Sequence, residues 1–99
     1  MKKHNVTVTF DGRKTKCKPG RLEVDPGDTV QWTSAEGELA LDFPAETPFT
    51  STQVWKARRG ELTPIAIVKP DAPKGRVFRP TISIDAKLVA KSLGDVIIR

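Results

Sequence analysis

The stretch Leu22–Trp32, LEVDPGDTVQW, contains two short runs of alternating apolar and polar residues joined by Pro26-Gly27-Asp28. Alternation with a period of two residues is typical of a strand that buries one face. Proline presets φ and glycine permits a positive φ, so Pro26-Gly27 favours a type II turn. The stretch therefore predicts one strand through Leu22 and Val24, a tight corner, and a second strand through Val30 and Trp32.

The same period-two pattern continues through most of the 99 residues. It predicts further strands in 6–10, 13–18, 38–43, 63–70, 76–85 and 95–99. Pro80 cannot donate to a sheet ladder, so it belongs at an edge or a bulge. Helix is expected only as a turn near 52–58 and, by composition, in 86–93. A single domain over 1–99 is expected, built as an antiparallel all-β sandwich or barrel.

The segment 6–18 is interpreted as a hairpin, because Asp11-Gly12 is a favoured type I′ turn pair. A two-residue turn would place Val6 opposite Cys17 and Val8 opposite Thr15. One face of the hairpin would then carry Val6, Val8, Phe10, Thr15 and Cys17. The other face would carry Thr7, Thr9, Lys14, Lys16 and Lys18.

Positive charge is concentrated at the start of the chain. The net charge is +5, and residues 1–21 contain seven basic residues and one acidic residue. Lys14, Lys16 and Lys18 would project roughly 6 to 7 Å apart along one strand, with Arg21 and either Lys2 or Lys3 nearby. This spacing suits binding of a nucleic acid or another polyanion, although the face has no aromatic residues to stack on bases. The simpler interpretation is a solvated edge whose lysines prevent sheet-to-sheet pairing.

The segment 44–61 has no clear period and is expected to be a long connection. Phe49 and Trp55 within it, with Arg58 and Arg59, are candidates for contact with a protein partner. The alternative is that the two aromatic rings cap one end of the sandwich. Capping is the simpler interpretation of these two side chains.

The cysteine count and the length of the apolar runs bear on the compartment and on membrane association. One cysteine, Cys17, excludes an internal disulfide and a cysteine-rich metal cluster. No apolar run reaches the roughly 18 residues that a membrane span needs, and the first residues lack the apolar region of a signal peptide. A cytoplasmic protein is expected, although removal of a secretory leader would leave the same sequence.

The run CKPGRLEVDPGDTVQW (17–32) resembles the early signature of the cupredoxin-like family, in which Gly-Asp-Thr-Val-x-Trp leads into the sandwich core. Gly27, Asp28, Val30 and Trp32 match it directly. DAPKGRVFRPTISI (71–84) is similar to the run before the family's last copper-ligand loop, and DVIIR (95–99) resembles the tail of short bacterial members. The resemblance covers about two thirds of the chain and implies a Greek-key β-sandwich of seven to eight strands.

The resemblance does not extend to the copper ligands. A blue copper site needs two histidines and a cysteine thiolate, usually with an axial methionine. The family pattern places the first histidine at Leu39 and the other ligands near 80–87, where the chain has no His, Cys or Met. His4, Cys17 and Met1 all lie near the N-terminus. We therefore expect neither copper nor another cofactor.

Few residues of the chain are suited to catalysis. His4 and Cys17 fall on one face of the predicted hairpin, so a Cys-His pair is one interpretation, and a buried thiol beside a terminal histidine is the simpler one. The acidic residues Asp25, Asp28, Glu36 and Glu38 are expected to be solvated in turns and loops. The single histidine leaves no base for a serine or threonine nucleophile, and no glycine-rich phosphate loop is present.

The sequence therefore predicts a protein that is not an enzyme and binds no metal. Its expected role is that of a small protein-binding or assembly module, with 44–61 and the end of the sandwich that holds copper in the family as candidate contact surfaces. Binding of nucleic acid or another polyanion through the N-terminal lysines is the alternative. The two differ in their salt dependence, because polyanion binding weakens steeply as salt is added.

Overall fold

The computed structural model describes residues 2–44, 46–90 and 94–99. All regular structure in these ranges is β-strand. None of the described residues forms a helix that is long and apolar enough to cross a membrane. The strands are β1 (Lys3–Phe10), β2 (Thr15–Lys18), β3 (Arg21–Val24), β4 (Thr29–Thr33), β5 (Leu39–Asp42), β6 (Trp55–Ala57), β7 (Ala66–Ile67), β8 (Val77–Phe78), β9 (Thr81–Ile84), β10 (Lys87–Ala90) and β11 (Asp95–Ile98).

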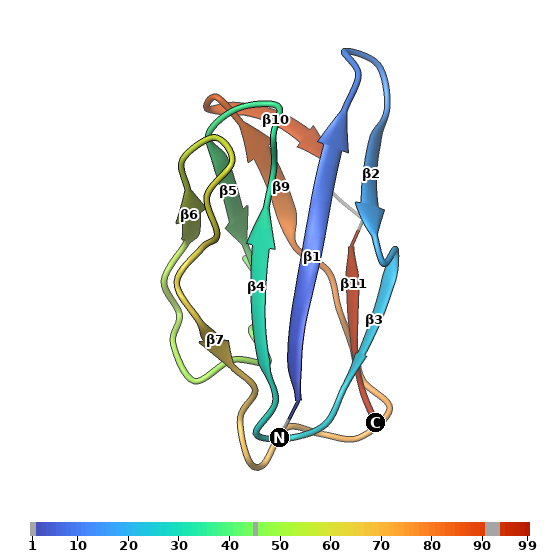
Figure 1. Ribbon diagram of the computed structural model, residues 1–99. Helices are drawn as coiled ribbons and strands as arrows, with labels where there is room; N and C mark the ends of the chain where they lie inside the picture. The colour runs from blue at the N-terminus through green and yellow to red at the C-terminus, as the bar shows by residue number, and fades with distance from the viewer. Residues whose placement is uncertain (1, 45, 91–93) are drawn as a thin grey trace.

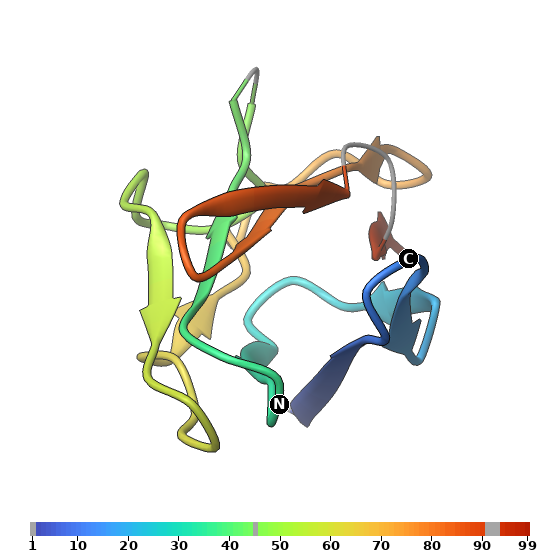
Figure 2. The ribbon, with the colours of Figure 1, turned by 90° about the horizontal axis from the view of Figure 1, so that it is seen from above.

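The strands form two layers that face each other across one core (Figure 1). One layer has the order β2-β1-β4-β7. The other combines the orders β10-β9-β5-β6 and β3-β11-β8, which are connected because β8 leads directly into β9. Seen from above, the strands surround a common interior (Figure 2). The all-β sandwich predicted from the sequence is confirmed.

The corner at 25–28 has the predicted geometry. The N–H of Asp28 donates to the carbonyl of Asp25 at 3.0 Å, and Gly27 has a φ of 90°. A positive φ at the third turn position is the mark of a type II turn. Because β3 pairs in one layer and β4 in the other, this corner carries the chain between the layers.

The pairing of strands differs from the purely antiparallel arrangement that was expected. β1 runs parallel to β4, with Val6 beside Trp32, and β3 runs parallel to β11. The remaining pairs between named strands are antiparallel. β2 and β3 follow one another in the direction opposite to β1 (Figure 1), and the corner at 25–28 then reverses the chain, so β4 runs in the direction of β1.

The structure has more and shorter strands than the seven to eight expected, with eleven in the described ranges. Pro19-Gly20 separates β2 from β3, and Arg79-Pro80 separates β8 from β9. The interruption at Pro80 confirms that this proline ends a ladder, as a residue without an N–H must.

The hairpin of β1 and β2 has a longer turn than predicted, which corrects its register. Val8 lies opposite Cys17, and Phe10 opposite Thr15. The carboxylate of Asp11 accepts the N–H groups of Arg13 and Lys14, each at 2.8 Å, so a loop of four residues replaces the two-residue turn. The register moves by two residues, so each side chain keeps its predicted face, but Lys14 leaves the strand for the loop.

The two segments where helix was expected form strands at sheet edges. The turn expected near 52–58 contains β6, which pairs with β5, and 86–93 contains β10, which pairs with β9. Asp85 and Ala86 have φ values of 51° and 65° and make the turn into β10. Positions 91–93 lie outside the described residues. The helix expectation is therefore wrong for the described part of both segments, because these short runs pair as edge strands instead.

Candidate functional site

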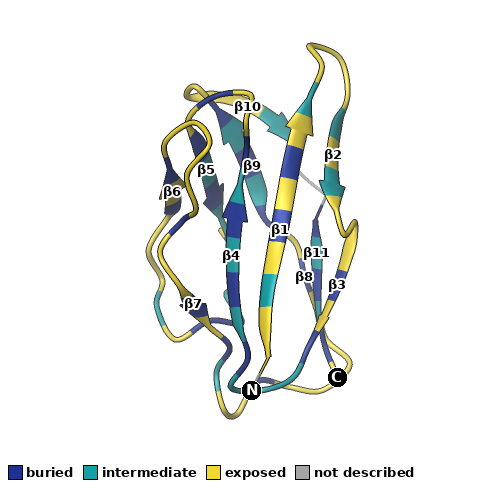
Figure 3. Ribbon diagram, in the orientation of Figure 1, coloured by how far each residue is buried: buried dark blue, intermediate teal, exposed yellow. Residues whose placement is uncertain are grey.

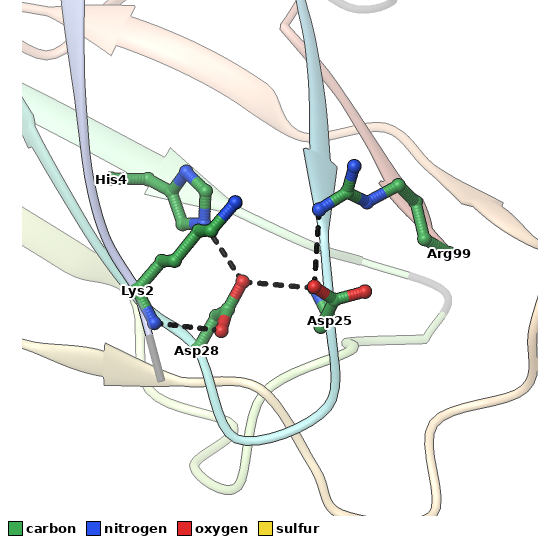
Figure 4. Close-up of polar contacts among 5 residues, drawn as sticks. All are labelled: Lys2, His4, Asp25, Asp28 and Arg99. Atoms are coloured by element: carbon green, nitrogen blue, oxygen red, sulfur yellow. Dashed lines mark hydrogen bonds and ion pairs between the residues drawn. The ribbon is translucent and has the colours of Figure 1, made fainter.

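Asp28 is the most deeply buried carboxylate in the described part of the chain, with 2% of the residue exposed. Its Oδ1 accepts the N–H of Lys2 at 2.9 Å, and its Oδ2 accepts the N–H of Asp25 at 3.0 Å. Oδ2 also lies 2.9 Å from His4 Nε2 (Figure 4). Burial alone would raise the pKa of Asp28, but these hydrogen bonds outweigh it and lower the pKa to about 2. The expectation of a solvated turn residue was wrong for Asp28.

The sequence carried a signal for this burial that the turn interpretation overlooked. Asp28 shares the parity of Val30 and Trp32, which are both buried, so a strand begun at Asp28 turns its side chain toward the core. A buried carboxylate needs hydrogen-bond donors, and here they come from the start of β1 and from the turn itself. We assign Asp28 a structural role, because it fastens β1 to the corner.

The structure does not bring His4 and Cys17 together. His4 contacts Asp28, whereas Cys17 lies opposite Val8, four residues or roughly 13 Å farther along β1. Cys17 is half-buried, and burial raises the pKa of its thiol to about 11. The thiol therefore stays protonated at neutral pH, and the Cys-His interpretation is wrong.

Phe49 and Trp55 are core residues, which corrects the interpretation of them as exposed anchors. Their exposed fractions are 0% and 2%. Their ring centroids lie 5.5 and 6.1 Å from that of Trp32. Arg58 and Arg59 remain exposed, and Arg59 Nε donates to the carbonyl of Ala35 at 2.9 Å. Of the four candidate contact residues, only these two arginines offer a surface.

A hollow of about 710 Å³ lies between the segments 42–53 and 69–78, and we call it the side groove. Its floor contains the buried residues Phe43, Ala72 and Phe78. On its rim Arg76 forms an ion pair with Glu46, and the Arg76 guanidinium lies 5.4 Å from the centroid of the Phe78 ring. The sequence indicated the first segment as a contact surface. It gave no signal for the second, because only folding places the two side by side.

The predicted anion-binding lysines are split between elements. Lys16 and Lys18 project from β2 beside Thr9 and Thr7, as predicted for that face. Lys14 lies in the loop 11–14, where it lines a shallow hollow of about 270 Å³ together with Lys16, Asp11 and Glu36. Arg21 begins β3 and belongs to the other layer. The exposed residues alternate with buried ones along β1 (Figure 3), and Lys3 joins the lysine face from there.

The two segments that would hold copper ligands according to the resemblance do meet. Leu39 of β5 lies directly opposite Ile84 of β9, and their exposed fractions are 0% and 5%. Beside them Asp85 Oδ1 accepts the N–H of Glu38 at 2.9 Å. A Cβ on Gly37 would lie 2.6 Å from Asp85 Oδ2, so a side chain fits at position 37 only if this carboxylate moves. These contacts join the loop before β5 to the turn between β9 and β10, where the N–H of Asp85 also donates to the carbonyl of Glu38 at 2.9 Å. Both connections lie toward the top of Figure 1.

Comparisons with known proteins address the fold. No family model and no curated protein matches the chain. A solved structure that does match is a pseudoazurin from Sinorhizobium meliloti, with a TM-score of 0.56 and 17% sequence identity over 100% of this chain and 75% of that chain. The fold is cupredoxin-like. At this identity the likeness extends to the fold alone.

The cupredoxin-like fold implies a copper ion, so the residues at the expected position decide whether one fits. Leu39 and Ile84 provide neither imidazole nor thiolate, and the nearby Asp85 carboxylate already accepts a backbone N–H. Across the described ranges, no three His, Cys, Asp or Glu side chains gather where they could hold a metal ion. Copper in proteins prefers imidazole and sulfur ligands, so this end of the cupredoxin-like sandwich does not fit it.

Proposed function

We propose that this chain is a copper-free, non-catalytic cupredoxin-like module that binds a protein partner in the side groove. The observation that carries the proposal is the groove itself, a hollow of about 710 Å³ with a buried aromatic floor and a charged rim. An apolar floor surrounded by polar groups is the usual anatomy of a binding site. The apolar pair Leu39 and Ile84 supports the copper-free part of the proposal.

The state of the reactive groups supports a role without catalysis. The Cys17 thiol has a pKa raised to about 11 and is half-buried, so it makes a poor nucleophile. His4 is occupied by Asp28, whose carboxylate also holds two backbone N–H groups. Neither side chain lines the side groove. His4 and Cys17 therefore do not provide a base and a nucleophile within reach of one substrate.

The shape of the side groove favours a protein segment over a small ligand. A second hollow of about 400 Å³ shares Pro44, Glu46, Arg76 and Phe78 with it and continues to Arg79. The ion pair of Arg76 and Glu46 lies where the two hollows meet. An elongated site of this kind suits an extended peptide, with the aromatic floor contacting apolar side chains and the rim contacting polar ones.

Site-specific photo-crosslinking in an extract of the source organism tests the proposal. A photoreactive amino acid replaces Gln53, an exposed residue that lines the groove, or in a control Lys87, an exposed residue of β10 that does not line it. We expect a discrete protein adduct from position 53, and its loss when Thr52→Trp fills the groove. An adduct equally strong from position 87, or one unaffected by Thr52→Trp, would contradict the proposal.

A further inference from the structure

The outer face of the strands β2, β1 and β4 has an unusual composition for a surface of this chain. The strand registers place Lys18 and Thr33 on either side of Thr7, Lys16 beside Thr9, Asn5 beside Gln31, and Lys3 beside Thr29. All are exposed or half-buried, and each alternates with a residue that points inward. The face therefore carries three cations and otherwise only hydroxyl and amide side chains. It has neither a carboxylate nor an aromatic ring.

The cations of this face differ from three of the arginines elsewhere in the fold. Arg76, Arg79 and Arg99 each form an ion pair, with Glu46, Asp95 and Asp25. Lys3, Lys16 and Lys18 form none with any residue that the structure describes. Residues 1–21 supply seven of the basic residues and one acidic residue. No ion pair among the described residues neutralises these three lysines, so their positive potential is available to an anionic ligand.

We infer that this face binds an acidic polysaccharide. In this arrangement Lys3, Lys16 and Lys18 contact the sulfate or carboxylate groups of the polymer, and the hydroxyl and amide groups between them hydrogen-bond its sugar hydroxyls. Lys16 and Lys18 lie roughly 7 Å apart along β2, and neighbouring strands are about 4.8 Å apart. Lys3 lies four residues farther along β1 than Thr7, the residue opposite Lys18, so the three cations follow one another along a polar strip on β2 and β1. This spacing suits a linear polymer lying along the strands.

The composition of the strip favours a polysaccharide over a nucleic acid. Single-stranded nucleic acids gain much of their affinity from bases that stack on aromatic side chains. The strip has Asn5, Thr7 and Thr33 where such rings would have to stand. Phe10, at the end of β1, turns to the inner side of the sheet and packs against the core. Binding of a nucleic acid would therefore depend on its phosphates alone.

The end of the face next to the loop 11–14 is less favourable for an anionic polymer. Asp11 and Glu36 line the hollow that also contains Lys14 and Lys16, so this end carries two carboxylates. Asp11 is held by the N–H groups of Arg13 and Lys14, which lower the pKa of its carboxyl. An anionic polymer is therefore expected to lie toward Lys18 and Lys3 and away from the loop 11–14.

Binding of the intact protein to immobilised heparin, a sulfated polysaccharide, tests the inference. The test variant combines Lys3→Gln, Lys16→Gln and Lys18→Gln. The matched control combines Lys56→Gln, Arg58→Gln and Lys87→Gln, which removes the same charge from exposed cations elsewhere. We expect the test variant to bind roughly tenfold or more weakly and the control to bind within about threefold of the wild type. Equal losses in both variants would overturn the inference, because net charge alone would then explain binding.

A second pair of measurements separates the two polymers. The double variant Asn5→Ala, Thr7→Ala is expected to weaken heparin binding several-fold and to leave binding of oligothymidylate unchanged. Tighter binding of oligothymidylate than of heparin would overturn the inference in favour of a nucleic acid. Absence of binding to both polymers at low salt would overturn it in favour of a solvated edge that prevents sheet pairing. The substituted residues of this face do not line the side groove. The polymer measurements therefore leave the proposal of a protein partner in the groove untouched, and the two can fail separately.

Discussion

His4 Nε2 lies 2.9 Å from Asp28 Oδ2, and this contact joins the start of β1 to the corner that leads into β4. The same corner is held from the other side, because Arg99 donates to the carboxylate of Asp25 at 3.1 Å. The N–H of Arg99 also donates to the carbonyl of Val24 at 2.9 Å. Residues near both ends of the chain are thus fastened to 24–28, the turn that carries the chain from one layer to the other.

Replacement of Asp28 by asparagine is expected to lower the free energy of unfolding by about 2 to 3 kcal/mol. The amide would turn an NH2 group toward donors that now have a carboxylate oxygen, and one buried donor would lose its partner. Urea unfolding followed by Trp fluorescence measures the loss. The control is Asp25→Asn, which removes an exposed ion pair and is expected to cost less than about 1 kcal/mol. Equal losses would contradict the assignment.

The lowered pKa of Asp28 predicts how stability depends on pH. The folded pKa is about 2 and the ordinary value is 3.8, so folding favours the charged form. The stabilisation is complete above about pH 5 and is lost as the pH falls through 3.8 toward 2, in total about 2 kcal/mol. Urea unfolding between pH 6 and pH 2 should show a smaller loss for Asp28→Asn than for the wild type. Parallel pH profiles would mean that other carboxylates cause the effect.

Gly37→Ala is expected to destabilise the protein by about 1 to 3 kcal/mol, because its Cβ would lie 2.6 Å from Asp85 Oδ2. The carboxylate cannot withdraw without losing its hydrogen bond to the Glu38 N–H. Gly20→Ala is the matched control, since a Cβ there meets nothing closer than the Cys17 carbonyl oxygen at 3.6 Å. A thermal denaturation midpoint for Gly37→Ala no lower than that of Gly20→Ala would refute the close approach.

Cys17 is expected to react slowly with a thiol reagent such as Ellman's reagent in the folded protein. With a pKa of about 11, only about one thiol in a thousand is ionised at pH 8. Unfolding in urea removes the burial that raises the pKa, so the labelling rate should rise by roughly a hundredfold or more. Similar rates with and without urea would show that the thiol is already accessible and readily ionised in the fold.

Much of the fold followed from local pattern. The turn at 25–28, the alternation in β5 and the interruption at Pro80 were all predicted, because turn chemistry and side-chain parity are local properties. The parallel pairing of β1 with β4 was not, since a period of two gives no information on which strand becomes a neighbour. The hairpin register was wrong by two residues because the Asp11 carboxylate stabilises a longer loop.

The candidate surfaces were harder to predict than the strands. Phe49 and Trp55 lie in an aperiodic segment, where sequence cannot distinguish an exposed ring from one that packs on Trp32. The side groove depends on residues about thirty positions apart meeting in space, so it had no local signature. The lysines of β2 were correctly placed on one face. Lys2 or Lys3 was expected near them, and the structure places Lys3 on this face. The polar residues of β4 that complete the face were missed, because the pairing of β1 with β4 was unknown.

Titration of the intact protein with copper tests the central claim most directly, because the claim is that this cupredoxin-like fold has an apolar pair where a metal site would stand. We predict no stoichiometric copper binding and no visible absorption band from thiolate coordination, since Leu39 and Ile84 occupy that position. The titration is repeated with His4→Gln to remove the one imidazole near the N-terminus. One copper per chain bound with a thiolate band, and retained in His4→Gln, would contradict the account.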